Sequence, residues 1–125
     1  MRFFILIAFT AIAVSFAGNL NPKEELKKFS NALHEHLLAH NNSIIDPEFV
    51  MITPKVNITR QQFIDHILPA INITKPDNLD DTEASFTSEG LLKLVHLNNT
   101  EQYGLAKPNA NIKGGYTLFR LVYEK

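Results

Sequence analysis

The spacing of apolar residues changes about half-way along this 125-residue chain, from a helical repeat to a strand-like pattern. In the first half, apolar side chains recur at steps of three and four, as in helices with one buried face. From Leu79 to Glu124, short apolar runs are separated by turn residues, as in a meander of strands. The sequence therefore predicts an α+β fold with N-terminal helices packed on one face of a curved antiparallel sheet.

The first predicted helix has recognisable start and stop residues. Asn21 followed by Pro22, with two glutamates in the next turn, is a typical helix start. We expect this helix to run to about His40, where Asn41 and Asn42 stop it. Its apolar stripe consists of Leu26, Phe29, Leu33, Leu37 and Ile44.

A short strand and a second helix are expected next. The strand covers Phe49–Ile52, and the helix covers residues 60–68 and ends at Pro69. The buried side of this helix consists of Phe63, Ile64, Ile67 and Leu68. The strands of the second half are expected at residues 83–88, 91–97, 101–106 and 116–124.

The last predicted strand indicates which residues share a face of the sheet. Because side chains alternate along a strand, one face is predicted to carry Phe119, Leu121 and Tyr123. The opposite face is predicted to carry Tyr116, Leu118, Arg120, Val122 and Glu124. The first of these faces is the apolar one, and the second is mixed.

The N-terminus has the three parts of a secretory signal peptide. Arg2 supplies the positive charge, residues 3–14 supply the apolar core, and Ser15 and Ala17 are small residues at positions −3 and −1. The apolar run is shorter than the roughly 20 residues that a membrane span needs. We therefore expect residues 1–17 to be removed and residues 18–125 to form one secreted domain without a membrane segment.

Composition narrows the function classes open to this domain. Without Arg2, eleven basic side chains stand against thirteen acidic ones, so no positive field is present to hold a nucleic acid. The chain has no cysteine, so an apolar core has to hold the fold without disulfides. Asn-x-Ser/Thr sequons predict surface glycosylation at Asn41, Asn57, Asn72 and Asn98.

Two motifs lie between the start of the first strand and the second helix, namely DPEFV at residues 46–50 and NITRQQFI at residues 57–64. With the order of the elements, they resemble small secreted members of the nuclear-transport-factor-2-like superfamily, which includes ketosteroid isomerase and the SnoaL-like polyketide cyclases. The resemblance covers Lys23 to Glu124 and implies a cone-shaped, cystatin-like α+β fold. The alternative is a true cystatin-like inhibitor fold, but the inhibitor-loop pattern Gln-x-Val-x-Gly is absent.

The resemblance leaves the activity open, because this fold hosts isomerases, dehydratases, ligand carriers and protein-binding modules. In the ketosteroid-isomerase branch, an Asp base lies roughly ten residues before the second helix, which corresponds to about Val50 here. Val50 and its neighbours cannot accept a proton. The nearest acids are Asp46, in the turn before the strand, and Glu48, which fits only with an alignment gap. We therefore expect no catalytic residue and no cofactor, and an enzyme is the less favoured interpretation.

The segment HEHLLAH, residues 34–40, has the densest group of histidines. His36 and His40 are four residues apart, as in metal-binding helices. The zincin motif His-Glu-x-x-His is not met, however, and two ligands are too few for a zinc site. We therefore predict no metal. His34 is expected to point to solvent, and His36 and His40 to lie at the border of the core, bonded to backbone or solvent.

A pocket between the first helix and the sheet is the predicted binding site. An apolar pocket with a few polar groups is the usual design of a small-molecule site. The predicted lining consists of Leu33, His36, Leu37, His40, Phe86, Leu94, Phe119 and Leu121. The alternative is that the apolar members of this set simply fill the core.

Three functions are open from the sequence. The favoured one is a secreted, non-catalytic domain that binds a small apolar ligand or a protein partner. The second is an isomerase or dehydratase that uses His36 or His40 as a base, opposite a donor such as Tyr123. The third is a homodimer that associates through an exposed apolar sheet face at Leu118 and Val122, without a useful cavity.

Overall fold

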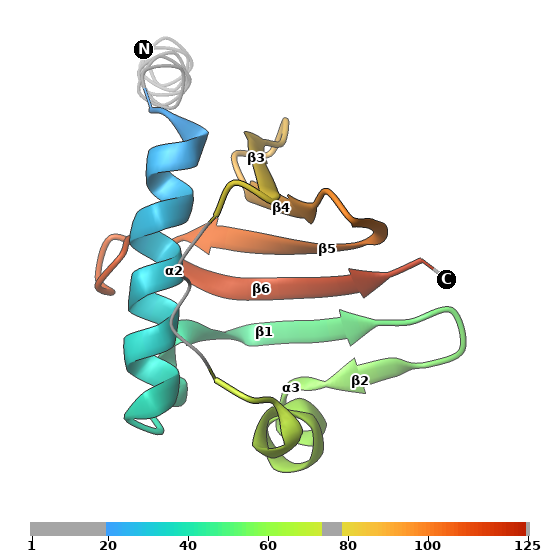
Figure 1. Cartoon of the computed structure of the whole chain (residues 1–125). Helices are drawn as coiled ribbons and strands as arrows, with labels where there is room; N and C mark the ends of the chain where they lie inside the picture. The colour runs from blue at the N-terminus through green and yellow to red at the C-terminus, as the bar shows by residue number, and fades with distance from the viewer. Residues whose placement is uncertain (1–19, 74–78, 125) are drawn as a thin grey trace, which may run out of the picture.

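The computed structural model describes residues 20–73 and 79–124, and these form one long helix and a six-stranded sheet (Figure 1). The helix α2 (Pro22–Leu38) lies across one end of the strands. The strands are β1 (Ile45–Ile52), β2 (Asn57–Thr59), β3 (Thr82–Phe86), β4 (Leu92–His96), β5 (Asn99–Pro108) and β6 (Tyr116–Tyr123). The predicted α+β class is confirmed.

The predicted signal peptide, residues 1–17, lies outside the described residues. Among the helices of the described part, none is long and apolar enough to cross a membrane.

Helix α2 begins and ends as its local sequence dictates. The Asn21 side chain accepts a 2.9 Å hydrogen bond from the Lys23 amide, and Pro22 occupies the first turn. The helix ends at Leu38, slightly earlier than predicted, because His40 adopts a left-handed conformation with φ of 55°. The buried side of α2 consists of Glu25, Leu26, Phe29 and Ala32.

Strand β1 starts at Ile45, earlier than predicted. The hydrogen bonds of the Asp46 side chain hold Asp46 and Pro47 in the strand. Asp46 Oδ1 accepts a 2.9 Å hydrogen bond from the Glu48 amide, and Asp46 Oδ2 accepts one of 2.9 Å from the Thr117 hydroxyl. Both Asp46 and Thr117 are buried. The register of the pairing with β6 shifts over this stretch, so the DPEF motif forms a bulge that Asp46 holds in shape.

The second predicted helix is present as a continuous helical stretch, residues 60–70, which we call the α3 segment. It consists of α3 (Arg60–Gln62), a π-helical turn (Phe63–Ile67) and a 3-10 turn (Leu68–Ala70). Thr59 and Gln62 form a capping box at its start. The Arg60 guanidinium donates to the carbonyls of Asn42 at 2.9 Å and Ile45 at 3.2 Å, which ties the α3 segment to the start of β1.

The sheet is mixed, whereas the sequence predicted an antiparallel one. Its order is β2-β1-β6-β5-β4-β3, and strands β3 to β6 form the expected antiparallel meander. Strands β1 and β6, however, pair in parallel. A parallel pair needs a long connection between its strands, and here most of the chain supplies it. The first and last strands are therefore neighbours in the middle of the sheet.

A bulge at Phe119 changes the predicted faces of β6. Leu118 pairs with Ala106, and Arg120 pairs with Leu105, so Phe119 has no partner on β5. One extra residue reverses the alternation of every residue after it. Leu121 and Tyr123 share a face as predicted, but the prediction that Phe119 lies with them, and Leu118 on the opposite face, is wrong.

The two faces of the sheet differ in chemistry. The face that α2 and the α3 segment cover, here called the inner face, carries the cross-strand neighbours Leu92, Ala106 and Leu118 and then Leu94, Gly104 and Leu121. The outer face carries Lys93, Leu105, Arg120, Val95, Tyr103 and Val122. On this side, Lys107 and Arg120 lie over the Phe119 ring, at 5.4 and 3.8 Å from its centroid.

The loop between β5 and β6 packs directly on α2. A Cβ added to Gly114 would lie 2.5 Å from the Ala32 Cβ, and the φ of Gly114 is 90°. Just after this loop, the Tyr116 hydroxyl donates a 3.0 Å hydrogen bond to Glu25 Oε1, and Lys28 lies 2.6 Å from the other oxygen. Burial, and then the hydrogen bond to Glu25, raise the pKa of Tyr116.

The asparagines of the predicted sequons are all exposed. They are Asn41, Asn57, Asn72 and Asn98. Asn41 also caps a 3-10 turn (Asn42–Ile44), and residue 74, which completes one sequon, lies outside the described residues. Glycosylation at these positions stays a prediction.

Candidate functional site

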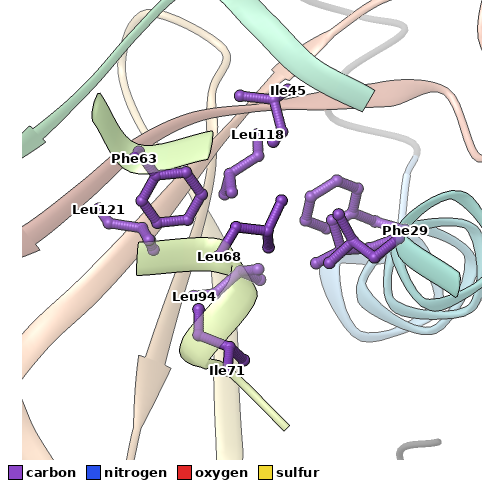
Figure 2. Close-up of a pocket in the computed structure, with 11 residues that line it drawn as sticks. Phe29, Ile45, Phe63, Leu68, Ile71, Leu94, Leu118 and Leu121 are labelled. Atoms are coloured by element: carbon purple, nitrogen blue, oxygen red, sulfur yellow. The ribbon is translucent and has the colours of Figure 1, made fainter. Parts of the chain in front are cut away.

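An apolar cavity of about 320 Å³ lies between α2, the α3 segment and the inner face of the sheet (Figure 2). Helix α2 contributes Phe29, Leu33 and Leu37. The α3 segment and the residue after it contribute Phe63, Leu68 and Ile71. The sheet contributes Ile45, Leu94, Gly104, Leu118 and Leu121. Every residue of this lining is apolar, so the cavity offers hydrocarbon contact on each wall.

Local sequence patterns position two of these walls. Phe29, Leu33 and Leu37 are spaced by four residues and so lie on one face of α2. Phe63, in the α3 segment, lines the cavity. Its ring packs against the ring of Phe49, with 4.7 Å between the two centroids. Because Phe63 is buried and tightly packed, this wall is preformed.

Gly104 forms part of the third wall, between Leu94 on β4 and Leu121 on β6. Its backbone is not in the left-handed region, so the conformation does not require a glycine. An added Cβ would meet the Leu121 side chain at 3.6 Å, an ordinary contact distance. The missing side chain therefore leaves space at this point of the inner face, as glycines in strands do where another group approaches closely.

The cavity is open to solvent beside Ile71. This residue lines the cavity and is nevertheless 45% exposed. Leu33 and Leu37, across from it on α2, are half-buried. An apolar molecule entering here meets hydrocarbon from the rim inward.

Four of the predicted pocket residues line this cavity, namely Leu33, Leu37, Leu94 and Leu121. Phe86 is outside the lining and packs against the core from β3. Phe119 is also outside it, because the bulge places its ring beside Lys107 and Arg120. The sequence analysis missed Phe29, Ile45, Phe63, Leu68, Ile71, Gly104 and Leu118. Of these, Phe29, Phe63 and Leu68 carried a usable signal, since the sequence places each of them on the apolar side of its helix.

The predicted histidines are likewise outside the cavity lining. His36 Nδ1 lies 2.7 Å from the Ala32 carbonyl oxygen within α2, which agrees with a border position bonded to backbone. His40 is exposed beyond the helix end. His34 is half-buried, and its Nδ1 is buried without a hydrogen-bond partner among the described residues. The prediction that His34 points to solvent is therefore wrong.

The acidic residues near the cavity are engaged elsewhere. Asp46 binds Thr117, Glu48 is exposed, and the buried Glu25 accepts from Tyr116. In residues 20–73 and 79–124, no group of three or more His, Cys, Asp or Glu side chains is placed to hold a metal ion. The lining itself has no group that accepts or donates a proton, so its chemistry is that of a binding surface.

Comparisons with protein-family models, with curated proteins and with solved structures find no match to this chain. The class of protein domain to which this chain belongs is therefore defined by its fold and its cavity alone. It is an α+β domain in which a long helix and a short helical segment enclose an apolar cavity against a mixed sheet.

Proposed function

We propose that residues 18–125 form a secreted, non-catalytic domain that takes up a small apolar molecule in this cavity. The observation that carries the proposal is an open cavity of about 320 Å³ with an entirely apolar lining. Burial of hydrocarbon surface contributes roughly 25 cal/mol per Å². A ligand can therefore gain affinity here without any specific polar contact.

The cavity volume sets the size of this ligand. A volume of about 320 Å³ lies at the lower end of the range of small-molecule pockets, roughly 300–1,000 Å³. Taking about 30 Å³ for each water in the liquid, the cavity corresponds to roughly ten non-hydrogen atoms. The proposed ligand is thus a medium-chain or small cyclic hydrocarbon.

The proposal includes membership of the nuclear-transport-factor-2-like superfamily, with a cone-shaped interior. It is supported by the element order, in which α2, β1 and the α3 segment precede four antiparallel strands. The two motifs behind the resemblance also have defined structural roles. Asp46 of DPEFV fastens β1 to β6, and Thr59 and Arg60 of NITRQQFI fix the α3 segment.

Export and glycosylation belong to the same proposal. The exposed positions of Asn41, Asn57, Asn72 and Asn98 support it, because a glycan has to sit on the surface. The absence of cysteine is compatible with export, since buried side chains from α2, the α3 segment and the sheet form one core.

Two observations favour binding over the other functions. His36 and His40, the candidate bases, lie outside the cavity lining. The homodimer interpretation needs Leu118 and Val122 on one exposed face, but the bulge separates them, and Leu118 lines the cavity.

The proposal is tested by titrating the glycosylated mature protein with naphthalene, an apolar probe of suitable size, while amide chemical shifts are recorded. We expect saturable binding, with the largest shifts at Leu94, Gly104 and Leu121. Gly104→Val fills the cavity floor and should reduce the affinity at least tenfold, which corresponds to about 1.4 kcal/mol.

The matched control is Leu105→Val, one residue further along β5 on the outer face. It should leave naphthalene binding unchanged. Failure of the wild-type protein to bind, or equal binding by the Gly104→Val protein, would contradict the proposal. Native mass spectrometry of the protein from its source would show any retained small molecule and the subunit number.

A further inference from the structure

We infer that the natural ligand is amphipathic, with its hydrocarbon part in the apolar cavity and one uncharged oxygen in a polar cleft beside it. The inference rests on the proposed function, because it extends the same site. The cleft has a volume of about 200 Å³ and lies on the inner face, lined by residues of β3, β4, β5 and β6. Its polar side chains include those of Thr82, His96, Gln102 and Tyr123, and Tyr103 also contributes to the lining.

These four side chains come from two cross-strand pairs, together called the polar row, and a register shift after Val95 separates the two pairs. Thr82 on β3 pairs with His96 on β4, and Gln102 on β5 pairs with Tyr123 on β6. The preceding row on the same face consists of Ala84, Leu94, Gly104 and Leu121. Along each of these strands, the inner face therefore changes from apolar to polar within two residues.

The cavity and the cleft adjoin each other. Leu94, Gly104 and Leu121 line both of them. Since Gly104 has no side chain, no group rises from the inner face at the boundary between the cavity and the cleft. A molecule that fills the apolar cavity and extends along the sheet over Gly104 thus arrives at the polar row.

The polar row presents free hydrogen-bonding groups. His96 Nδ1 accepts a 3.2 Å hydrogen bond from the Asn98 amide, so in the neutral ring Nε2 carries the proton and is a donor. The Tyr123 hydroxyl and the Gln102 amide are half-buried and make no hydrogen bond within the described part of the chain. Each of these groups can donate to an oxygen acceptor.

The charge of the lining selects the kind of oxygen. Among the residues that the structure describes, no lysine, arginine, aspartate or glutamate lines the cleft. A carboxylate or an ammonium group held there would lack a paired charge, and removing it from water is costly. A hydroxyl or a carbonyl oxygen needs only hydrogen bonds, so the proposed ligand is a medium-chain alcohol, aldehyde, ketone or ester.

The test compares octane, octan-1-ol and octanoate, titrated into the mature protein at about pH 8, where ordinary histidines are neutral. We expect octan-1-ol to bind about fivefold more tightly than octane, the effect of one net hydrogen bond. Tyr123→Phe should remove this fivefold advantage and leave the affinity for octane unchanged. Leu105→Val, on the outer face of β5 and outside the lining of both the cavity and the cleft, should change neither.

The outcomes separate the inference from the proposed function. Equal binding of octane and octan-1-ol, or no effect of Tyr123→Phe, overturns the inference and leaves the apolar cavity as a binding site. Tighter binding of octanoate than of octan-1-ol also overturns it, because the oxygen would then be charged. If none of the three probes binds, the proposed function is wrong, and the inference falls with it.

Discussion

The Thr117 hydroxyl donates a 2.9 Å hydrogen bond to Asp46 Oδ2, and both side chains are buried where β1 meets β6. The second oxygen of the same carboxylate accepts from the Glu48 amide. One acidic residue therefore maintains both the bulge of β1 and its parallel contact with β6. This structural role explains an Asp-Pro-Glu step in a strand, where proline is otherwise unfavourable.

Removing the Asp46 carboxylate is expected to destabilise the protein. Asp46→Ala should lower the free energy of unfolding by about 2–3 kcal/mol, because a charged hydrogen bond is lost and the Thr117 hydroxyl and the Glu48 amide lose their acceptor. Asp46→Asn keeps an acceptor for the Glu48 amide and should cost less. Urea denaturation of the three proteins measures both differences. Equal losses of unfolding free energy for the two variants would contradict the role of the hydrogen bond from the Glu48 amide in the bulge.

Because of Tyr116, the free energy of unfolding should fall as the pH rises in the alkaline range. Its pKa in the folded protein is raised by burial and by Glu25 above the ordinary value of about 10. The folded state thus binds the proton more tightly than the unfolded state does. The resulting stabilisation is complete below about pH 10 and is lost as the pH rises through the folded pKa.

The Tyr116→Phe protein has no such proton and should lack this loss. The measurement is the change in unfolding free energy between about pH 9 and about pH 11 in both proteins. The wild-type protein is expected to lose more stability over this interval than the variant. Identical losses would show that other groups account for the alkaline effect.

Replacing His40 by glycine is expected to stabilise the protein. His40 ends α2 in a left-handed conformation, φ 55°, in which a side chain is unfavourable and glycine is not. His40→Gly should therefore raise the unfolding free energy by roughly 1 kcal/mol. Ala39→Gly is the control, because the φ of Ala39 is −82° and glycine there only adds freedom to the unfolded chain. Thermal and urea unfolding should rank the proteins His40→Gly, wild type, Ala39→Gly.

The contact of Gly114 with α2 predicts a difference between two adjacent glycines. Gly114 and Gly115 both have positive φ, 90° and 80°. A Cβ on Gly115 would meet nothing within 4 Å, whereas one on Gly114 would meet Ala32 at 2.5 Å. Gly115→Ala should cost about 1 kcal/mol for backbone conformation alone. Gly114→Ala should cost at least about 1 kcal/mol more, because overpacking is added. Similar unfolding free energies for the two variants would contradict the close contact.

Local signals in the sequence were sufficient for the two helical elements of the fold, whereas the short strand β2 was not predicted. Asn21 and Pro22 start α2, and the NITRQQ segment starts the α3 segment, because caps act within a few residues. The parallel pairing of β1 with β6 was not predicted, because it joins residues about seventy positions apart. The bulge at Phe119 was missed for a similar reason, since it depends on how β5 and β6 align and not on β6 alone.

Only those residues of the candidate site that follow from the helical or strand repeat were predicted. Leu33 and Leu37 follow from the helical repeat, and Leu94 and Leu121 from strand alternation. Phe119 was wrongly included because its phase was taken from an unbroken strand. The α3 segment supplies a whole wall of the cavity, and its position depends on the long-range hydrogen bonds of Arg60, which no local pattern indicates.

The adjacency of β1 and β6 has a consequence for biosynthesis. The β2-β1 pair and the β5-β4-β3 meander are joined only through β6, so the two parts of the sheet cannot combine until the C-terminal residues have been made. The contacts between these two parts should therefore form in one late step, after the ribosome has completed β6. Truncation by even a dozen residues at the C-terminus removes all of β6 and should leave a product that quality-control proteases degrade.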